Sequence, residues 1–412
     1  MQEENNKNVI QTITFGCRLN AVESEKIAKM LQNTVASAIV VNTCAVTGEA
    51  ERQSAQYVRR IARDNPHVPL FITGCAATHD VAPFAQFPNV RVIPNADKLN
   101  RDAYIQAIAD FDFTDAAPDI HVSNPDTQMS KQFIQIQNGC NHDCTYCITR
   151  LLRGPSISFE YADILTDARN AVKNGYNEIV LTGIDSASYV KIYDGKPWLI
   201  SDLCRKLLDD VPEIKRLRLS SMDPASPEIY KIIDLMHETK RMMPHLHLSM
   251  QSGADTILKL MRRRHTANMI QDIVAYAPDI TFSWDIICGF PGETDELFDQ
   301  TLDLIAKTKP IKIHAFPFSP RPGTPAATMP AQVDKSISKQ RVKIVTDAAT
   351  RNRKDFMNTQ LGQTISVLVE NDNIGRTPND ITVKILGDNI PNRTICDCKI
   401  IGIDNENFIA NI

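Results

Sequence analysis

The sequence predicts an α/β protein in which an N-terminal parallel α/β sheet domain precedes a partial TIM-like barrel and a small C-terminal β-barrel. Short apolar runs alternate with amphipathic stretches, and this alternation stops and then restarts after residue 130, which predicts two parallel α/β units. After residue 361, short alternating strands are separated by turn signals such as DNIGRTPND and LGDN, which predicts the small barrel. A chain of 412 residues is long enough for several compact units.

Residues 1–111 predict the N-terminal domain. Its expected strands are ITFGC, SAIVVNTC, PLFITGC and VRVIPNA, and they alternate with ESEKIAKMLQ, with an arginine-bearing helix that ends at Asn65 and with a last helix through Ile108. Strand–helix alternation of this kind is typical of a parallel sheet. Residues 112–130 are rich in Asp, Ala, Pro and Ser, without a sustained period, which predicts a linker.

Residues 131–330 predict six strand–helix units. The expected strands are FIQIQNG, EIVLTGI, RLRLSS, HLHLSM, ITFSWDIICGF and IKIHAFPF. Because a closed barrel needs eight units, we expect an incomplete (β/α)6 barrel with its chemistry at the carboxyl edge of the strands. Residues 331–360 predict a basic helical connector, and residues 361–412 the C-terminal β-barrel.

The composition indicates the cellular compartment more clearly than it indicates the function. The formal net charge of -4 means that any nucleic-acid site must be a local basic patch. The first ten residues, MQEENNKNVI, lack the basic start and apolar core of a secretory signal, and no later segment reaches membrane-spanning length, so we expect a cytoplasmic protein without a membrane partner. Ten cysteines in a reducing compartment indicate metal binding or catalysis more than disulfides.

Three of these cysteines lie within eight residues. In QNGCNHDCTYC, Cys140, Cys144 and Cys147 follow a predicted strand at the catalytic rim of the barrel. Structural zinc needs four closed ligands, and neither His142 nor a partner pair supplies the fourth. Three thiolates suit a 4Fe-4S cluster with one free iron. The alternatives are a zinc knuckle or small buried hydrophobic residues.

Three further cysteines end predicted strands of the first domain. Cys17 ends ITFGC, Cys44 ends VVNTC and Cys75 ends FITGC. The tips of parallel strands share one edge of the sheet, so we expect these side chains to converge there. Three thiolates again suggest a cluster with a free iron, and the alternative is that they are core residues.

The motif C-x-x-x-C-x-x-C, with Tyr146 before its third cysteine, resembles the signature of the radical S-adenosylmethionine (SAM) superfamily. The resemblance implies that the open iron chelates SAM and that an electron from the cluster breaks a carbon–sulfur bond to give a 5′-deoxyadenosyl radical. Four residues at later strand ends are candidates for holding SAM, with ordinary turn chemistry as the alternative: Gly183, Gln251, Asp285 and Gly289.

The stretches FGCRLNAVESEKI, VNTCAVTGEAERQS and ITGCAA resemble the N-terminal domain of the methylthiotransferases, and the NTCAVT run is more similar to the branch that acts on N6-threonylcarbamoyladenosine in tRNA. This resemblance implies two 4Fe-4S clusters and two SAM molecules, with sulfur and then a methyl group placed on C2 of the adenosine at position 37, in the anticodon loop. It also implies a sulfur source and an electron donor such as flavodoxin or ferredoxin. Arg153 and Gly154 follow the family pattern, whereas Thr149 stands where the family usually has proline.

The C-terminal segment resembles an RNA-gripping TRAM domain, chiefly in SVLVENDNIGRT, although its acidic residues outnumber its basic ones. Basic residues elsewhere are candidates for tracking phosphates, with a solvated helix face as the alternative. They are Arg52, Arg59, Arg60 and Arg63, then Lys339, Arg341, Lys343, Arg351 and Arg353, and also residues 262–264.

Three other functions stay open at this point. Two are the same chemistry on isopentenyladenosine in tRNA or on a ribosomal-protein aspartate. The third is a non-catalytic iron–sulfur protein that binds RNA, which would need closed four-cysteine sites instead of the two sets of three.

Overall fold

The computed structural model describes residues 10–32, 37–109, 111 and 129–412. It divides into two compact units. Unit 1 comprises the described residues before residue 112 together with Gly139–His142 and Cys147–Pro155, and unit 2 comprises the remaining described residues. The predicted linker is therefore described only at residues 129 and 130, and most of the MQEENNKNVI start lies outside the described residues.

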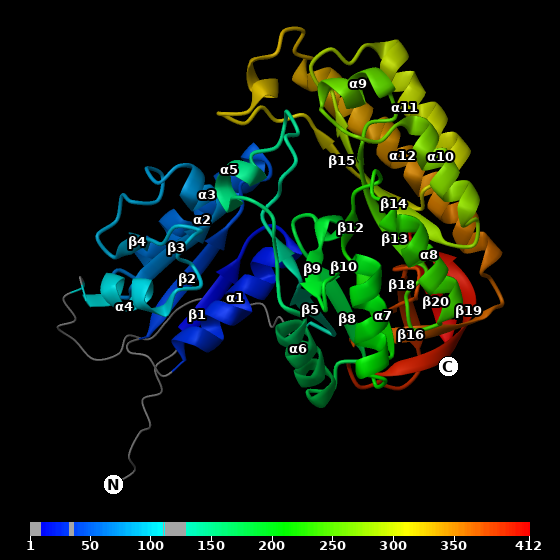
Figure 1. Cartoon of the computed structure of the whole chain (residues 1–412), viewed down its shortest axis with the longest axis horizontal. Helices are drawn as coiled ribbons and strands as arrows, with labels where there is room; N and C mark the ends of the chain where they lie inside the picture. Colours follow the sequence, from blue (N-terminus) through cyan, green and yellow to red (C-terminus); the bar gives the residue numbers. More distant parts are fainter. Residues whose placement is uncertain (1–9, 33–36, 110, 112–128) are drawn as a thin grey trace. The chain divides into compact units, whose positions relative to one another are not determined.

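Unit 1 is built on a parallel sheet of order β1-β2-β3-β4 (Figure 1). Its elements are β1 (Ile10–Thr14), α1 (Arg18–Leu31), β2 (Ala38–Thr43), α2 (Gly48–Asp64), β3 (Leu70–Gly74), α3 (Cys75–His79), β4 (Val90–Val92), α4 (Arg101–Ala109) and α5 (Thr149–Arg153). Ile39 and Val41 of β2 belong to one apolar core, and Ala38 and Val40 belong to another. Because the strand is buried on both faces, its first four residues are all apolar.

The arginine-bearing helix α2 begins where the sequence carries a strong start signal. The Thr47 side chain accepts a hydrogen bond from the Ala50 N–H at 3.1 Å, and Glu49 and Glu51 occupy the first turn. Both features satisfy or complement the free N–H groups of a helix start. The predicted end at Asn65 is confirmed, since Asn65 is the C-cap residue.

Unit 2 contains the predicted partial barrel. Its six barrel strands are β5 (Lys131–Gln135), β8 (Glu178–Thr182), β11 (Arg216–Leu219), β13 (His245–Gln251), β14 (Thr281–Cys288) and β15 (Lys312–Pro317). Its helices are α6 (Tyr161–Lys173), α7 (Ile200–Asp210), α8 (Glu228–Glu238), α9 (Asp255–Leu260), α10 (Ala267–Tyr276) and α11 (Asp295–Thr308). The short strands are β6 (Gln137–Asn138), β7 (Ile157–Ser158), β9 (Val190–Tyr193), β10 (Lys196–Leu199) and β12 (Ser221–Met222).

The barrel sheet is interrupted in the middle, which the sequence does not predict. The strands form one parallel sheet of order β11-β8-β5 and a second of order β12-β13-β14-β15. Between them, an isolated parallel bridge joins Leu217 to Met242. One large core nevertheless runs through both sheets and includes Leu181, Leu217 and Trp284. The predicted α/β class and the six-strand partial barrel are thus confirmed.

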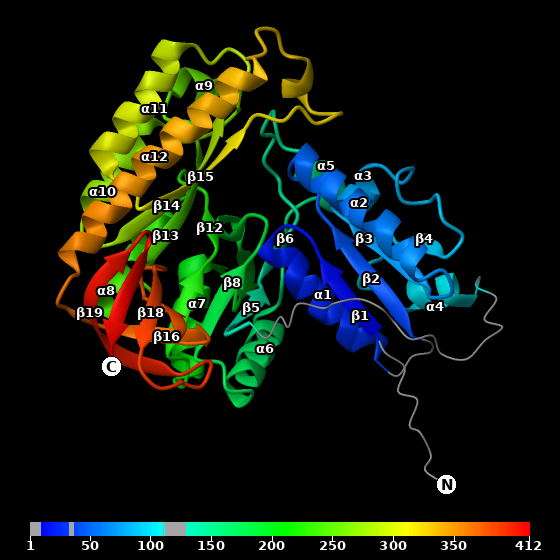
Figure 2. The same cartoon turned by 180° about the vertical axis from the view of Figure 1, so that it is seen from behind.

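The connector and the C-terminal barrel complete unit 2. Helix α12 (Lys335–Thr359) runs beside β15 and α11 (Figure 2). The strands β16 (Thr364–Asn371), β17 (Ile374–Arg376), β18 (Thr382–Leu386), β19 (Ile395–Asp404) and β20 (Asn407–Asn411) close into a barrel. A small closed β-barrel was predicted here and is confirmed. In the part of the chain that is described, each helix is too short or too polar to cross a lipid bilayer.

Buried charges join the C-terminal barrel to the amino ends of the central strands. The Glu178 carboxylate accepts from Arg218 Nε at 2.9 Å and lies 3.5 Å from Arg216 Nη1. The two arginines reach onward into the C-terminal barrel, where they donate to the backbone oxygens of Pro378 and Ser366, each at 2.9 Å. The two parts of unit 2 are therefore held together by directional bonds as well as by apolar contact.

Candidate active site

The three cysteines of the N-terminal domain lie at one edge of the unit 1 sheet. Cys17 is the N-cap residue of α1, three positions after β1, Cys44 follows β2, and Cys75 follows β3 as the first residue of α3. Since β1, β2 and β3 are adjacent and parallel, all three residues lie at the carboxyl edge, as predicted. Cys44 is buried, Cys75 is partly buried and Cys17 is exposed.

The thiols are close enough to influence one another electrostatically. Burial raises the pKa of the Cys44 thiol to about 11, and the neighbouring Cys17 and Cys75 raise it as well, whereas Arg153 lowers it. The Cys44 thiol therefore stays protonated at neutral pH unless a cation lies close to it. A metal centre supplies that cation because it deprotonates the thiols that bind it. The arrangement fits the predicted cluster.

Two glycines bring the strand ends close together. Gly16 has φ +91°, and a Cβ there would lie 2.4 Å from Cys44 Sγ. Gly74 has φ +95°, and a Cβ there would lie 2.3 Å from the Thr43 backbone oxygen. Both positions need glycine for the positive φ and for the close approach. This explains why a glycine precedes Cys17 and Cys75.

A buried charge cluster lies beside this cysteine site, and the sequence did not predict it. The Arg153 side chain is 2% exposed, and it donates to Glu23 Oε1 at 2.9 Å and to Asn20 Oδ1 at 2.6 Å. Lys98 Nζ contacts the other oxygen of Glu23 at 2.5 Å. Burial opposes the charge of Arg153, yet Cys75 and Glu23 hold the pKa of its guanidinium above the usual value.

This cluster contains two cations and one carboxylate, so it adds positive charge next to the cysteines. Such a surplus is costly in a buried place unless an anion balances it. Thiolates that hold a metal cluster are anions of that kind. The only signal in the sequence was the Arg153–Gly154 pair, which matches the family pattern without revealing its contacts.

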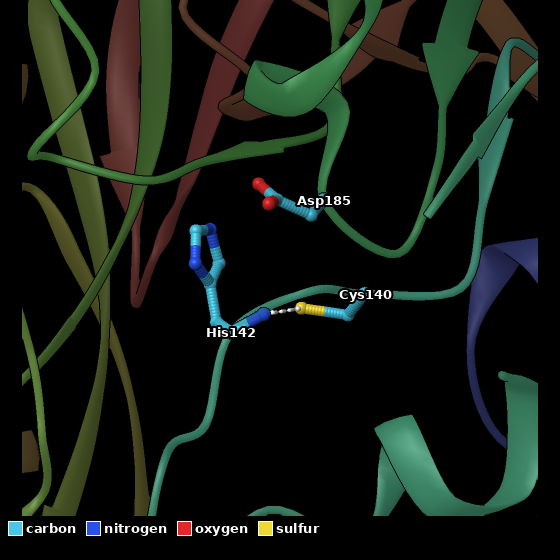
Figure 3. A group of neighbouring side chains, drawn as sticks. All are labelled: Cys140, His142 and Asp185. Carbon is cyan, nitrogen blue, oxygen red and sulfur yellow. Dashed lines mark hydrogen bonds between the residues drawn. The ribbon is translucent and has the colours of Figure 1, made fainter. Parts of the chain in front are cut away.

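The cysteines of the C-x-x-x-C-x-x-C motif, the first set, lie on the loop between β6 and α5. Cys140 and Cys147 belong to unit 1, whereas Cys144 belongs to unit 2. The Cys140 N–H donates to the Gly154 oxygen at 3.1 Å, and Cys140 Sγ accepts from the His142 N–H at 3.4 Å (Figure 3). Backbone N–H groups directed at sulfur suit a thiolate ligand.

Cys144 has its own support within unit 2. Arg263 Nη1 lies 3.6 Å from Cys144 Sγ, while Nη2 donates to Asp223 at 2.9 Å and to the Ser249 oxygen at 2.8 Å. Thr145, the next residue, donates its N–H to the Met261 oxygen at 3.2 Å. The prediction that residues 262–264 track RNA is thus wrong for Arg263, because its side chain is buried by these contacts.

Three of the four residues predicted to hold SAM lie at or just beyond the carboxyl ends of β8, β13 and β14, on the expected edge of the barrel: Gly183, Gln251 and Gly289. Asp285 lies within β14, three residues before its carboxyl end. Gln251 has φ +72°, and Asp285 pairs with His247 at 3.0 Å. A Cβ on Gly183 would lie 2.9 Å from Gln137 Oε1. These three stay predictions.

Gly289 requires a correction. A Cβ there would lie 1.9 Å from Ser338 Oγ of α12, and the Gly289 N–H donates to Glu293 Oε2 at 2.6 Å. The position is glycine because a helix packs against it, and its N–H is already bonded within the protein. The sequence DIICGFPGE gives no sign that Gly289 contacts α12, because the two are distant in the chain.

Two of the predicted RNA contacts are also wrong. Arg341 is buried and bonds Glu293 at 2.8 Å and Asp295 at 2.7 Å. Arg353 is buried and donates to the Glu406 oxygen at 2.9 Å. One side of helix α12 packs against the rest of unit 2. The charged residues on that side form contacts within the protein and are not available to bind RNA.

The other predicted RNA contacts are exposed. Arg52 forms a two-pronged pair with Glu49, and Lys343 pairs with Asp347 at 2.7 Å, so the charge of each is partly balanced. The remaining residues of the set stay predictions: Arg59, Arg60, Arg63, Lys339 and Arg351.

Two family models match the chain. The radical SAM superfamily model matches residues 134–305, and a model described as Uncharacterized protein family UPF0004 matches residues 9–93. Among solved structures, the radical S-adenosylmethionine methyltransferase TsrM from Kitasatospora setae shares the fold, with a TM-score of 0.55, 13% identity, and coverage of 78% of this chain and 77% of that chain. The fold and the three-cysteine loop thus define a radical SAM protein.

Sequence relatives specify the family within that class. Threonylcarbamoyladenosine tRNA methylthiotransferase MtaB of Rickettsia prowazekii is 39% identical over 385 residues, which is 91% of each chain. The enzyme of the same name from Bacillus subtilis is 31% identical over 384 residues, 87% of this chain and 84% of the relative. The tRNA-2-methylthio-N(6)-dimethylallyladenosine synthase of Erythrobacter litoralis is 31% identical over 382 residues, with 87% and 85% coverage. The chain belongs to the radical SAM methylthiotransferase family, and the resemblance found in the sequence is confirmed.

Proposed function

We propose that this enzyme methylthiolates C2 of N6-threonylcarbamoyladenosine at position 37 of tRNA, with two 4Fe-4S clusters and two SAM molecules. The convergence of Cys17, Cys44 and Cys75 at one sheet edge carries the proposal, because a radical SAM protein that only cleaves SAM needs no second set of thiolates. Two of the three relatives described above are named for this nucleoside, which favours it over dimethylallyladenosine.

Cys140, Cys144 and Cys147 would hold the cluster that binds SAM, and Cys17, Cys44 and Cys75 would hold the cluster that supplies sulfur. C2 of adenine carries an unactivated C–H bond with no acidic proton, so acid–base groups do not open it. When bound, the clusters and SAM supply the one-electron chemistry, sulfur and methyl group that this bond requires.

Residues of the chain position the clusters and their ligands. Arg263 donates to Cys144 and is itself held by Asp223, so it places a positive charge beside one thiol of the first set. Arg153, which Glu23 and Asn20 hold in place, puts a positive charge near Cys75 of the second set. Fixed hydrogen bonds to ligand sulfur orient the ligands and tune the metal that they hold. Gly16 and Gly74 leave the space that the second set needs.

The proposal includes an external sulfur source and an electron donor such as flavodoxin or ferredoxin, because the reaction consumes both and none of the residues discussed supplies either. A tRNA substrate and ten free cysteines support a cytoplasmic location.

The test is anaerobic reconstitution with SAM, sulfide and a reductant, followed by nucleoside mass spectrometry. Four substrates are compared: tRNA with the threonylcarbamoyl group, tRNA with the dimethylallyl group, tRNA with neither, and a ribosomal protein, whose product is followed by peptide mass spectrometry. We expect methylthio mass on the first alone. Product on the dimethylallyl tRNA alone would move the chain to the other branch, and product only on a ribosomal protein would refute an RNA substrate.

A further inference from the structure

A basic groove lies at the amino ends of the central strands of unit 2, on the edge opposite the one that carries Gly183 and Gln251. It has a volume of about 1010 Å³, and its walls are the loops before β8, β11 and β13 on one side and the C-terminal barrel on the other. Four cations line it, and none of its described lining residues is acidic: Lys215, Arg216, Lys240 and Arg393.

The groove is held open by bonds between its walls. Asn177 donates to the Arg393 oxygen at 2.7 Å, and Arg393 Nη1 donates to the Asn174 oxygen at 3.1 Å. Arg216 crosses to the Ser366 oxygen at 2.9 Å. A site with such fixed walls loses little freedom when a ligand binds.

The side chains of two of its cations have no partner among the described residues. Lys215 and Lys240 are exposed, and within the described ranges neither forms a hydrogen bond or an ion pair. Arg216 differs, because it shares its charge with Glu178. Unbalanced lysines around a concavity without acids attract a polyanion.

Arg393 and Tyr176 form a flat stacked surface at the groove. Its guanidinium lies over the Tyr176 ring at 3.8 Å, and its backbone has φ +69°, which is uncommon for a side chain of this size. Met236, Met242 and Met243 provide an apolar floor. Phosphate contacts beside apolar and stacking surfaces are typical of RNA interfaces.

We propose that this groove binds the sugar–phosphate backbone of the RNA substrate at a point remote from the reacting nucleoside, an inference that rests on the proposed function. The remoteness follows from the strands: β8 has five residues, so its two ends lie about 17 Å apart. The groove therefore anchors the body of the RNA while the reacting base lies at the carboxyl edge.

The barrel's acidic composition does not contradict this. Two of its acids, Glu370 and Asp380, face Lys131 of the central strands at 3.3 Å each, and Glu370 also pairs with Arg376. The charge of these two acids is balanced by cations inside unit 2. The net charge counted from the barrel sequence is therefore more negative than the charge of the surface that faces RNA.

The test is a charge reversal, Lys215→Glu with Lys240→Glu, in the reconstituted full chain. Binding of an unmodified tRNA transcript is followed by fluorescence anisotropy between 50 and 300 mM KCl. We expect at least tenfold weaker binding at about 100 mM salt and a salt slope smaller by about 1.5, since each phosphate contact contributes about 0.7–0.9. SAM cleavage without RNA should be unchanged, which shows that the variant folds.

The matched control is Lys307→Glu with Lys309→Glu, which makes the same charge change at exposed lysines of the same barrel end outside the groove. Equal tRNA affinity and slope in both double variants would overturn the proposal. So would unchanged tRNA binding together with loss of inorganic pyrophosphate binding, which would make the groove a small-anion site. If the groove variant loses tRNA binding but the wild type makes no methylthio product, the proposed function is wrong, whereas the assignment of the groove as an RNA-binding site is supported.

Discussion

Arg153 and Glu23 form a buried ion pair that links the two cysteine sets through unit 1, with Nη1 2.9 Å from Oε1. Arg153 follows Cys147 by six residues, and Glu23 follows Cys17 by six residues. The pair therefore ties the backbone beside one predicted cluster to the backbone beside the other. Transfer of sulfur to a carbon activated at the first cluster requires that such a spacing be kept.

Replacing Arg153 with Gln should destabilise unit 1 by about 3–5 kcal/mol, because Glu23 is fully buried and would keep Lys98 as its one cation among the contacts described above. Urea unfolding of the reduced, metal-free chain measures the effect. Arg153→Lys should be intermediate, since it retains the charge without the fork that reaches both Glu23 and Asn20. Arg150→Gln, an exposed change on the same helix, is the control. An equal loss in the Arg150 control would contradict a special role for the buried pair.

Cys17→Ala and Cys140→Ala should differ in what they retain. Each should lower the iron content from about eight to about four atoms per chain, because each removes a ligand of one cluster. Cys140→Ala should abolish SAM cleavage, whereas Cys17→Ala should still cleave SAM without forming a methylthio product. Iron analysis, 5′-deoxyadenosine assay and nucleoside mass spectrometry give the three readings. Equal loss of SAM cleavage in both variants would count against separate roles.

Gly16→Ala should prevent the second cluster from assembling while the first remains. The new Cβ would lie 2.4 Å from Cys44 Sγ, in addition to the strain at φ +91°. Gly195→Ala is the matched control, since Gly195 has φ +72° with nothing within 4 Å, so the control tests the φ strain alone. We expect about half the iron in the Gly16 variant and full iron in the control. Full iron in both would show that the thiols rearrange freely.

Arg263→Gln should lower the reduction potential of the cluster that binds SAM, because it removes a positive donor 3.6 Å from Cys144 Sγ. A redox titration followed by electron paramagnetic resonance measures this directly. Arg264→Gln is the control, because Arg264 also pairs with Asp223 but is largely exposed. An unchanged potential in Arg263→Gln would mean that the contact only supports the loop.

Acid should loosen the C-terminal barrel through Glu178. Burial by itself would raise the pKa of this carboxyl, but Arg218, Lys131 and Arg216 outweigh burial and bring the pKa to about 2, below its ordinary value of 4.5. A depressed folded pKa means that the stabilisation is present above pH 4.5 and is lost as the pH falls toward 2. The shift corresponds to about 3 kcal/mol.

Glu178→Gln should therefore lower the unfolding free energy by about 3 kcal/mol at pH 7, and the difference from wild type should shrink as the pH falls from 5 to 3. Urea unfolding at several pH values measures it. Glu213→Gln, an exposed change near β11, is the control. A pH-independent difference would assign the effect to packing instead of charge.

The sequence determined the elements that depend on local pattern. Alternation of apolar runs with amphipathic stretches predicted both parallel units, because a strand buried on two faces is mostly apolar. The six cysteines were predicted as ligands for a related reason: each set stands directly after predicted strands, and strand ends are where a parallel sheet presents its ligands.

The tertiary structure decided what depends on partners far apart in the chain. Arg153 and Glu23 are 130 residues apart, and Arg263 and Cys144 are 119 apart, so no local pattern indicates that they meet. The same limit explains Arg341, Arg353 and Gly289, whose partners lie on other elements. Charge counted along the sequence gives no information on which acids are balanced by distant cations, because Coulomb interactions depend on distance in space and not along the chain.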